Sequence, residues 1–282
     1  MNRALLVGLS VGIIGTTGCL PGDTRPDPGR VYLTAEPSDA TVNGFTTDDG
    51  WTIRFERVLM ALGYVWLVGD ECNVYTNTSY ERFFDFAVPG AQKIAEVYGL
   101  GQCDVEFLWW KPEKGALMGE GVSREDFQLL SAKNGDKFVT YVRGSAVRKQ
   151  QTIRFEWRFR RTTYLGDCRE TPDAAPTSSF SLEGGDDPRP RVVIHAENLF
   201  RAIGTNEPRY EFNIFASADN DGDGELSRSE MDELIFVQES PGSTVFASLH
   251  AFLEATRLPS WVEMDGASCR EIQPAYGDDL PF

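Results

Sequence analysis

The clearest pattern in the chain is a strict alternation of apolar and polar residues from Thr152 to Arg160. Successive side chains of a strand point to opposite faces, so one face here is wholly apolar and the other is polar or charged. The apolar face consists of Ile153, Phe155, Trp157 and Phe159. Shorter alternating patterns and apolar runs predict strands over residues 52–56, 62–68, 103–110, 137–142 and 191–195, and residues 81–88 fit a strand with a helix nearly as good. Residues 51–207 are therefore expected to form a β-rich body of the β-sandwich type.

Helical periodicity replaces this alternation after Pro208. Apolar residues recur every three or four positions, which predicts helices over residues 211–218, 230–238 and 243–258. Within the body, a short helix is expected over residues 92–98, and another begins near Ser123, whose side chain can cap the first turn. The predicted fold class is mainly β, with an α-rich segment over residues 208–282 packed on the body.

Residues 1–18 have the composition of a signal peptide. An apolar stretch from Ala4 to Gly15 follows a basic start and precedes the small residues Thr16, Thr17 and Gly18. A transmembrane helix needs ~20 apolar residues, so this stretch is too short to span a bilayer. We expect an exported chain with no membrane-spanning helix.

Cys19 follows those small residues directly, and this arrangement resembles the lipobox of bacterial lipoproteins, although Thr16 stands where Leu is usual. The resemblance implies that Cys19 is diacylated, becomes the new N-terminus and anchors the protein to a membrane of the cell envelope. The outer membrane, at its periplasmic face or at the cell surface, is the expected location. Residues 19–50 are rich in Pro, Gly, Asp and Thr, which favours a flexible tether behind the anchor.

The remaining cysteines are even in number, as expected for disulfides in an oxidising compartment. They are Cys72, Cys103, Cys168 and Cys269. Three pairings are possible, and neighbours along the chain are often neighbours in space, which favours Cys72 with Cys103 and Cys168 with Cys269. Zinc is not expected because no two of these cysteines have the short spacing that zinc sites use.

A strong chemical motif lies between the first two predicted helices, from Asp219 to Glu230. Acids stand at its first, third and fifth positions, Gly at the sixth, an aliphatic residue at the eighth, a hydroxyl at the ninth and Glu at the twelfth. This pattern resembles the EF-hand loop, in which oxygen atoms coordinate Ca²⁺. The resemblance implies side-chain ligands from the acids and Ser227 and a main-chain carbonyl from Glu225. The full implied set is Asp219, Asp221, Asp223, Glu225, Ser227 and Glu230.

EF-hands generally pair, and the best-placed second candidate runs from Ser260 to Glu271. It has Val262 and Met264 where acids should stand, so it is at most a degenerate partner. Extracellular calcium modules bind the ion at about 10⁻⁴–10⁻³ M, more weakly than cytosolic sensors. A structural calcium site is therefore expected rather than a switch.

The net charge of −16 changes the list of expected partners, since it repels phosphate backbones and makes nucleic acid an unlikely ligand. The chain has two histidines, and none of the common hydrolase, zinc or nucleotide motifs occurs in it. The sequence predicts a non-enzymatic, calcium-binding lipoprotein of the cell envelope whose β-rich body binds an unidentified protein or small molecule. The alternative is a secreted hydrolase stabilised by calcium, which a cleft with perturbed titratable groups around His195 or His250 would favour.

Overall fold

A computed structural model describes residues 26–76, 81–112, 115–130, 137–202, 209–237 and 245–272. Within these ranges the backbone forms a continuous 15-stranded sheet and a separate two-stranded ribbon. The expected signal peptide and Cys19 lie outside the described residues. The mainly β fold class is confirmed, and the architecture differs from a sandwich.

The centre of the fold is a closed barrel of six strands. Each strand pairs with the next around the ring, and β6 closes the ring by pairing antiparallel with β1. Five of these pairings are antiparallel, whereas β1 and β12 run parallel. In ring order the strands are β1 (Gly29–Pro37), β12 (Arg191–Ile194), β16 (Val262–Met264), β17 (Ala267–Glu271), β10 (Thr163–Arg169) and β6 (Gln92–Trp109).

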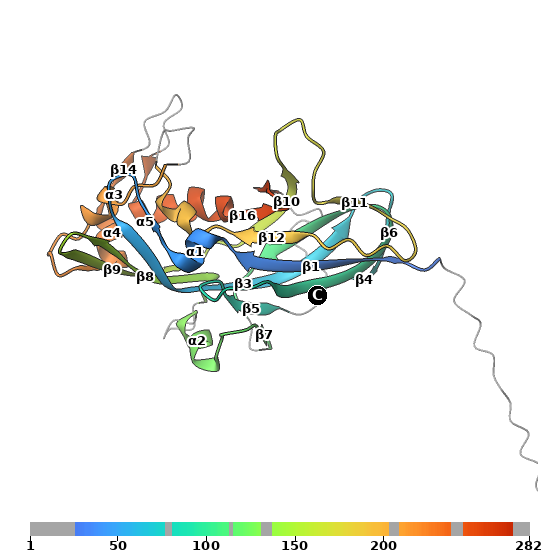
Figure 1. Ribbon diagram of the computed structural model, residues 1–282, viewed down its shortest axis with the longest axis horizontal. Coiled ribbons are helices and arrows are strands. Elements are labelled where there is room, and N and C mark those ends of the chain that lie inside the picture. The colour runs from blue at the N-terminus through green and yellow to red at the C-terminus, as the bar shows by residue number, and fades with distance from the viewer. Residues whose placement is uncertain are drawn as a thin grey trace, which may run out of the picture.

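The sheet continues beyond the barrel because β6 is long enough to pair with a further strand, β3 (Thr52–Val68). From β3 the order runs through β8 (Thr140–Arg148) and β9 (Gln151–Phe159) to β13 (Glu225–Leu226). The alternation predicted for β9 is confirmed, since its four apolar side chains are at most 1% exposed. Figure 1 shows β8 and β9 extending to one end of the molecule, where α3, α4 and α5 also lie.

The remaining elements are short. The other strands are β2 (Phe45–Thr46), β4 (Cys72–Thr76), β5 (Arg82–Asp85), β7 (Leu117–Met118), β11 (Ser179–Leu182), β14 (Phe236–Val237) and β15 (Val245–Phe246). The helices are α1 (Asp39–Asn43), α2 (Arg124–Leu129), the 3₁₀ helix η1 (Ala196–Phe200), α3 (Asn213–Ala216), α4 (Arg228–Glu233) and α5 (Leu249–Phe252). A π-helical turn, η2 (Leu253–Arg257), and a 3₁₀ turn, η3 (Leu258–Trp261), continue α5. None of the helices in the described ranges is long and apolar enough to cross a membrane.

The predicted tether over residues 19–50 is wrong where the structure describes it. Residues 29–37 form the barrel strand β1, in which Val31, Leu33 and Ala35 are fully buried. Their side chains alternate inward along the strand, and the antiparallel pairing with β6 holds the segment in the barrel. The tether can therefore extend no further than the residues before β1.

The predicted α-rich segment over residues 208–282 is also wrong. Its helices are brief, and its last described part supplies the barrel strands β16 and β17. The proposed boundary between residues 207 and 208 therefore divides a single barrel. The helix predicted over residues 92–98 is instead the first part of β6, whereas the predicted helix after Ser123 is present as α2 with a capping box.

Two disulfides join neighbouring strands in the expected pairing. Cys72 on β4 is bonded to Cys103 on β6, and Cys168 on β10 is bonded to Cys269 on β17. The second bond links strands that are far apart along the chain but adjacent in the barrel. Disulfides persist in oxidising compartments, so the two bonds indicate an extracytoplasmic protein.

Candidate functional site

The acidic loop from Asp219 to Glu230 follows α3 and runs into the first turn of α4, at the end of the molecule to which β9 extends (Figure 1). Carboxylate oxygens of Asp219, Asp221 and Asp223 lie within 4.8 Å of one another. Asp221 and Asp223 are exposed, and Asp219 is partly buried. In the part of the chain that the structure describes, no arginine or lysine forms an ion pair with any of the three.

Backbone hydrogen bonds within the loop hold these carboxylates in place. The amide of Gly222 donates to Asp219 Oδ1 at 2.9 Å, and the amide of Asp223 donates to Asp221 Oδ1 at 3.1 Å. The amide of Glu225 donates to Asp223 Oδ1 at 2.7 Å. Each carboxylate therefore has one oxygen fixed by the backbone, which leaves its remaining oxygen lone pairs available to a cation.

The end of the loop is organised by Glu230. Its Oε2 accepts hydrogen bonds from the amide and the hydroxyl of Ser227, and the Ser227 hydroxyl in turn accepts from the Glu230 amide, which is a capping box for α4. Its Oε1 accepts from the amide of Asn220 at 3.2 Å. The Glu230 carboxylate thus faces back toward the start of the loop, although it stands apart from the group of three aspartates.

The loop is attached to the sheet through β13, which pairs parallel with β9. The amide of Arg154 donates to the Gly224 carbonyl at 2.8 Å, and Trp157 Nε1 donates to the Leu226 carbonyl at 3.1 Å. Gly224 has a φ of +77°, and a Cβ there would lie 3.0 Å from the Thr152 carbonyl, so this turn requires glycine. Leu226 is 1% exposed. The body of the protein therefore supports the loop directly.

The predicted helix–loop–helix pair is not clearly formed, because α3 has four residues and α4 has six. Phe215 before the loop and Met231 after it are buried, as expected, but Ile235 is 70% exposed. The segment from Ser260 to Glu271 is not a second EF-hand, since it forms the end of η3 and the barrel strands β16 and β17. In the structure the short strand of the acidic loop, β13, pairs with β9 and not with a second EF-hand loop.

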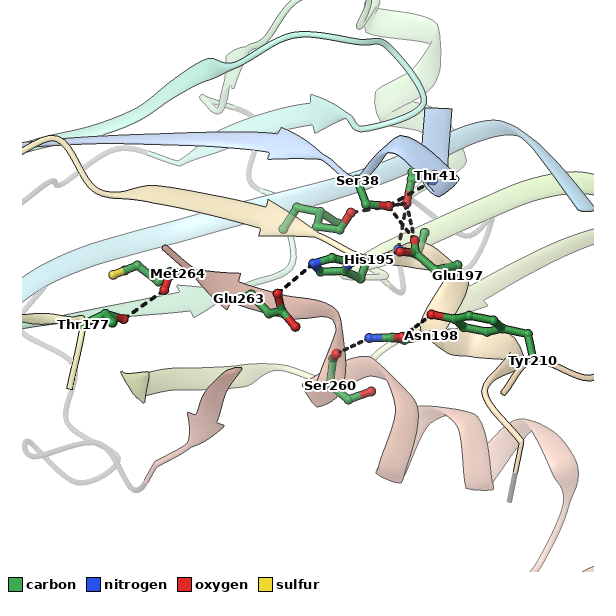
Figure 2. Close-up of polar contacts among 12 residues, drawn as sticks. Ser38, Thr41, Thr177, His195, Glu197, Asn198, Tyr210, Ser260, Glu263 and Met264 are labelled. Carbon is green, nitrogen blue, oxygen red and sulfur yellow. Dashed lines mark hydrogen bonds and ion pairs between the residues drawn. The ribbon is translucent and has the colours of Figure 1, made fainter. Parts of the chain in front are cut away.

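Another acidic cluster surrounds His195 at the end of β12; the sequence singled out His195 as a candidate but did not indicate its partner Glu263. Figure 2 shows the imidazole between Glu197 on η1 and Glu263 on β16. Nδ1 lies 2.9 Å from Glu197 Oε1, and Nε2 lies 3.2 Å from Glu263 Oε2, close enough for an ion pair but not aligned as a hydrogen bond. The hydroxyls of Ser38 and Thr41, at the start of α1, donate to Glu197 Oε2 at 2.7 and 2.8 Å.

The electrostatics of this cluster favour a charged triad. Burial opposes protonation of His195, but the contacts with Glu197 and Glu263 outweigh it and raise the pKa to about 9. Burial of Glu197 is likewise outweighed, by the hydrogen bonds from His195 and Ser38, and its pKa is lowered. His195 is therefore protonated near pH 7 and cannot accept a proton from a substrate. The cluster ties β12, η1, β16 and α1 together.

His250, the other histidine, is packed in the interior. It is 2% exposed, its ring stacks on Phe159 with centroids 5.1 Å apart, and its Nε2 lies 3.0 Å from the Arg158 carbonyl. Burial lowers its pKa, which keeps the imidazole neutral. Neither histidine is among the described residues that line the pockets beside α5, the β8–β9 turn and α2.

Comparison with protein-family models, curated proteins and solved structures finds no match to this chain.

Proposed function

We propose that this protein is an exported, non-enzymatic calcium-binding protein of the cell envelope, in which Ca²⁺ stabilises the loop from Asp219 to Glu230. The observation that carries the proposal is the group of three aspartate carboxylates within 4.8 Å of one another, in a loop with the EF-hand pattern and no cationic partner among the described residues. Three negative charges this close repel one another, so a bound cation would stabilise the folded loop.

The donor set fits calcium. Ca²⁺ is a hard ion that takes 6–8 oxygen ligands, and every predicted ligand in this loop offers oxygen. The three aspartates would supply the first oxygens, the Glu225 carbonyl and Ser227 the next, and Glu230 the last. The Glu230 carboxylate already faces the start of the loop through its contact with the Asn220 amide, which supports its assignment as the closing ligand.

A structural role for the ion is favoured over a signalling role. The β13–β9 pairing and the Trp157 hydrogen bond join the loop to a fixed sheet, whereas sensor EF-hands move two helices apart. Calcium bound here would hold the loop, and with it the short helices α3 and α4, against β9. The β-rich body would then carry the interaction with a partner.

Attachment to a membrane through lipid on Cys19 is the second part of the proposal. The two disulfides support export, and the lipobox-like sequence supports acylation. Changing Cys19→Ser is expected to move the protein from the membrane fraction to the soluble fraction and to remove the mass of the acyl chains. Unchanged fractionation and unchanged mass would exclude the anchor without affecting the calcium site.

Calorimetric titration tests the calcium site directly. We expect the Cys19→Ser protein to bind one Ca²⁺ with a dissociation constant of about 10⁻⁴–10⁻³ M, and Mg²⁺ more weakly because its octahedral geometry suits a bidentate carboxylate poorly. Absence of any calcium-dependent heat at about 10 mM, well above that range, would contradict the proposal.

A further inference from the structure

A cavity of about 260 Å³ lies between η1, α3 and α5. Most of its wall is apolar and belongs to residues that are themselves buried, such as Leu199, Phe215, Leu249 and Phe252. Ile214 completes the apolar wall, and Arg201, Ala202 and Glu211 supply the polar part. An apolar recess with a few charged groups at one side is the usual form of a small-molecule site.

The charged side of the cavity is unusual for this acidic chain, because Arg201 lines it and Arg257, which is not itself part of the lining, contacts two of the lining residues. Arg257 Nη2 donates to the carbonyl of Ala202 at 3.4 Å, and its guanidinium carbon lies 5.2 Å from the centre of the Phe252 ring. Both of these residues line the cavity. Across the described ranges, no carboxylate forms an ion pair with Arg201 or Arg257, and the buried Arg257 Nε has no hydrogen-bond partner.

Burial and the positive charge of Arg201 together lower the pKa of Arg257 to about 10. In a chain with a net charge of −16, two arginines without an ion-pair partner among the described residues are a site of unneutralised positive charge. An anionic group placed between them would satisfy the free Nε–H and offset the repulsion.

We propose that this cavity binds a small amphipathic carboxylate, with its carboxylate on Arg201 and Arg257 and its alkyl chain against Leu199, Phe215 and Phe252. Guanidinium groups bind carboxylates with two parallel hydrogen bonds, which matches the arginine pair to this head group. A cavity of about 260 Å³ suits an alkyl chain of medium length better than a long-chain lipid. This inference does not depend on calcium binding.

Glu211 provides an internal control, because it is exposed and lines the same cavity. Its negative charge opposes the binding of a carboxylate, whereas it would assist the binding of an amine. If removing this charge strengthens the binding of a carboxylate, the cavity is an anion site. If it leaves that binding unchanged, the cavity is merely apolar.

The test is a calorimetric titration of the Cys19→Ser protein with octanoate, octan-1-ol and octylammonium, three probes with the same chain length and different head groups. We expect octanoate to bind about tenfold more tightly than octan-1-ol, since a hydrogen bond to a charged group contributes about that much, and octylammonium to bind worst. Equal affinity for octanoate and octan-1-ol, or no octanoate binding at about 10 mM, would overturn the proposal.

Variants then locate the head group. Arg201→Gln and Arg257→Gln are each expected to weaken octanoate binding about tenfold, and Glu211→Gln to strengthen it slightly. Arg143→Gln is the matched control, because Arg143 pairs with Glu56 on an exposed part of the sheet. Thermal melts check that each variant is folded. If Arg257→Gln does not fold, the octanoate affinity of Arg201→Gln tests the assignment. Wild-type octanoate affinity in folded Arg201→Gln would contradict the assignment.

Discussion

The two acidic clusters of this protein differ in how their charge is balanced. The carboxylates of Glu197 and Glu263 come from distant parts of the chain and surround a histidine whose pKa they raise. The three aspartates of the loop come from one short segment, are largely exposed, and have no cationic side chain beside them in the described ranges. One cluster has a cationic side chain of the protein between its carboxylates, and we propose that the other takes its cation from solution.

This difference separates a structural role from a binding role. A carboxylate pair that already holds a protonated histidine stabilises the fold and has no capacity left for a ligand. A group of carboxylates with free lone pairs and unrelieved repulsion gains free energy when an ion binds. Substitutions, calcium and pH should therefore affect the two clusters differently, and the largest effect is expected at the histidine.

Replacing His195, the cation of the Glu197–Glu263 cluster, should lower the stability of the protein most. His195→Gln removes the positive charge and leaves two carboxylates together, one of them buried, which is expected to lower the free energy of unfolding by about 3 kcal/mol. Urea denaturation measures this change. The double variant His195→Gln with Glu197→Gln should recover part of the loss, because it also removes the uncompensated buried charge. A loss below about 1 kcal/mol for the single variant would show that the triad is not an important contact.

Calcium should stabilise the protein through the aspartates of the loop alone. At 10 mM free ion and a dissociation constant of about 10⁻⁴–10⁻³ M, linkage gives about 1.4–2.7 kcal/mol, or about 3–10 °C in melting temperature. The shift is measured by thermal melts with calcium and with a chelator. It should persist in His195→Gln and disappear in Asp223→Asn. Loss of the calcium shift in His195→Gln would mean that the two clusters are not independent.

Alkaline pH should weaken the His195 cluster and leave the aspartates of the loop unaffected. The folded pKa of His195, about 9, lies above its ordinary value of 6.5, so its stabilising contribution is full below pH 6.5 and is lost as pH rises through 9. Allowing for the partial exposure of Glu263, we expect a loss of about 1–2 kcal/mol between pH 7 and pH 9.5. Urea denaturation at the two pH values measures it. His195→Gln should show little of this loss, and an equal loss in that variant would assign the effect to other groups.

The attachment of the loop to the body contributes a smaller effect. Trp157→Phe removes the hydrogen bond to the Leu226 carbonyl and is expected to cost about 1–2 kcal/mol of stability, because a buried acceptor loses its donor. Calcium should bind this variant more weakly, since part of the ion's binding free energy would be spent on ordering the loop strand. Unchanged calcium affinity would indicate that β13 does not need β9 to hold its position.

The same contrast explains what could be predicted from the amino-acid sequence. The acidic loop, the alternation of β9 and the capped start of α2 depend on residues close together in the chain, and the structure contains all three. The predicted pairing of consecutive cysteines is also present, although its second bond spans 101 residues. Local patterns specify the loop and the helix cap because the interacting atoms are a few residues apart.

Features that depend on distant pairing were not predictable. Residues 92–98 carry Ile94 and Val97 at a helical spacing, yet they are a strand because β1 pairs along them. Residues 29–37 lie in a segment with the composition of a tether, but their alternating small and branched side chains complete the barrel. The His195 triad likewise assembles only when the short hairpin of β16 and β17 joins the ring beside β12. No segment of the sequence contains these contacts by itself.

The most direct test of the account is the calcium affinity of Glu230→Gln compared with that of Glu225→Gln, measured by calorimetric titration. Glu230 is the expected closing ligand, whereas the Glu225 side chain pairs with Arg154 at 3.1 Å and only its backbone carbonyl is expected to bind the ion. Each change removes one carboxylate charge from the same loop, and the amide oxygen introduced by Glu230→Gln can still accept the capping hydrogen bonds. We predict that Glu230→Gln lowers the affinity by more than the ~10–100-fold typical of outer contacts, with the β circular dichroism signal unchanged, and that Glu225→Gln lowers it by less than about tenfold. Equal affinities in the two variants, or in Glu230→Gln and the wild type, would contradict a calcium site at this loop.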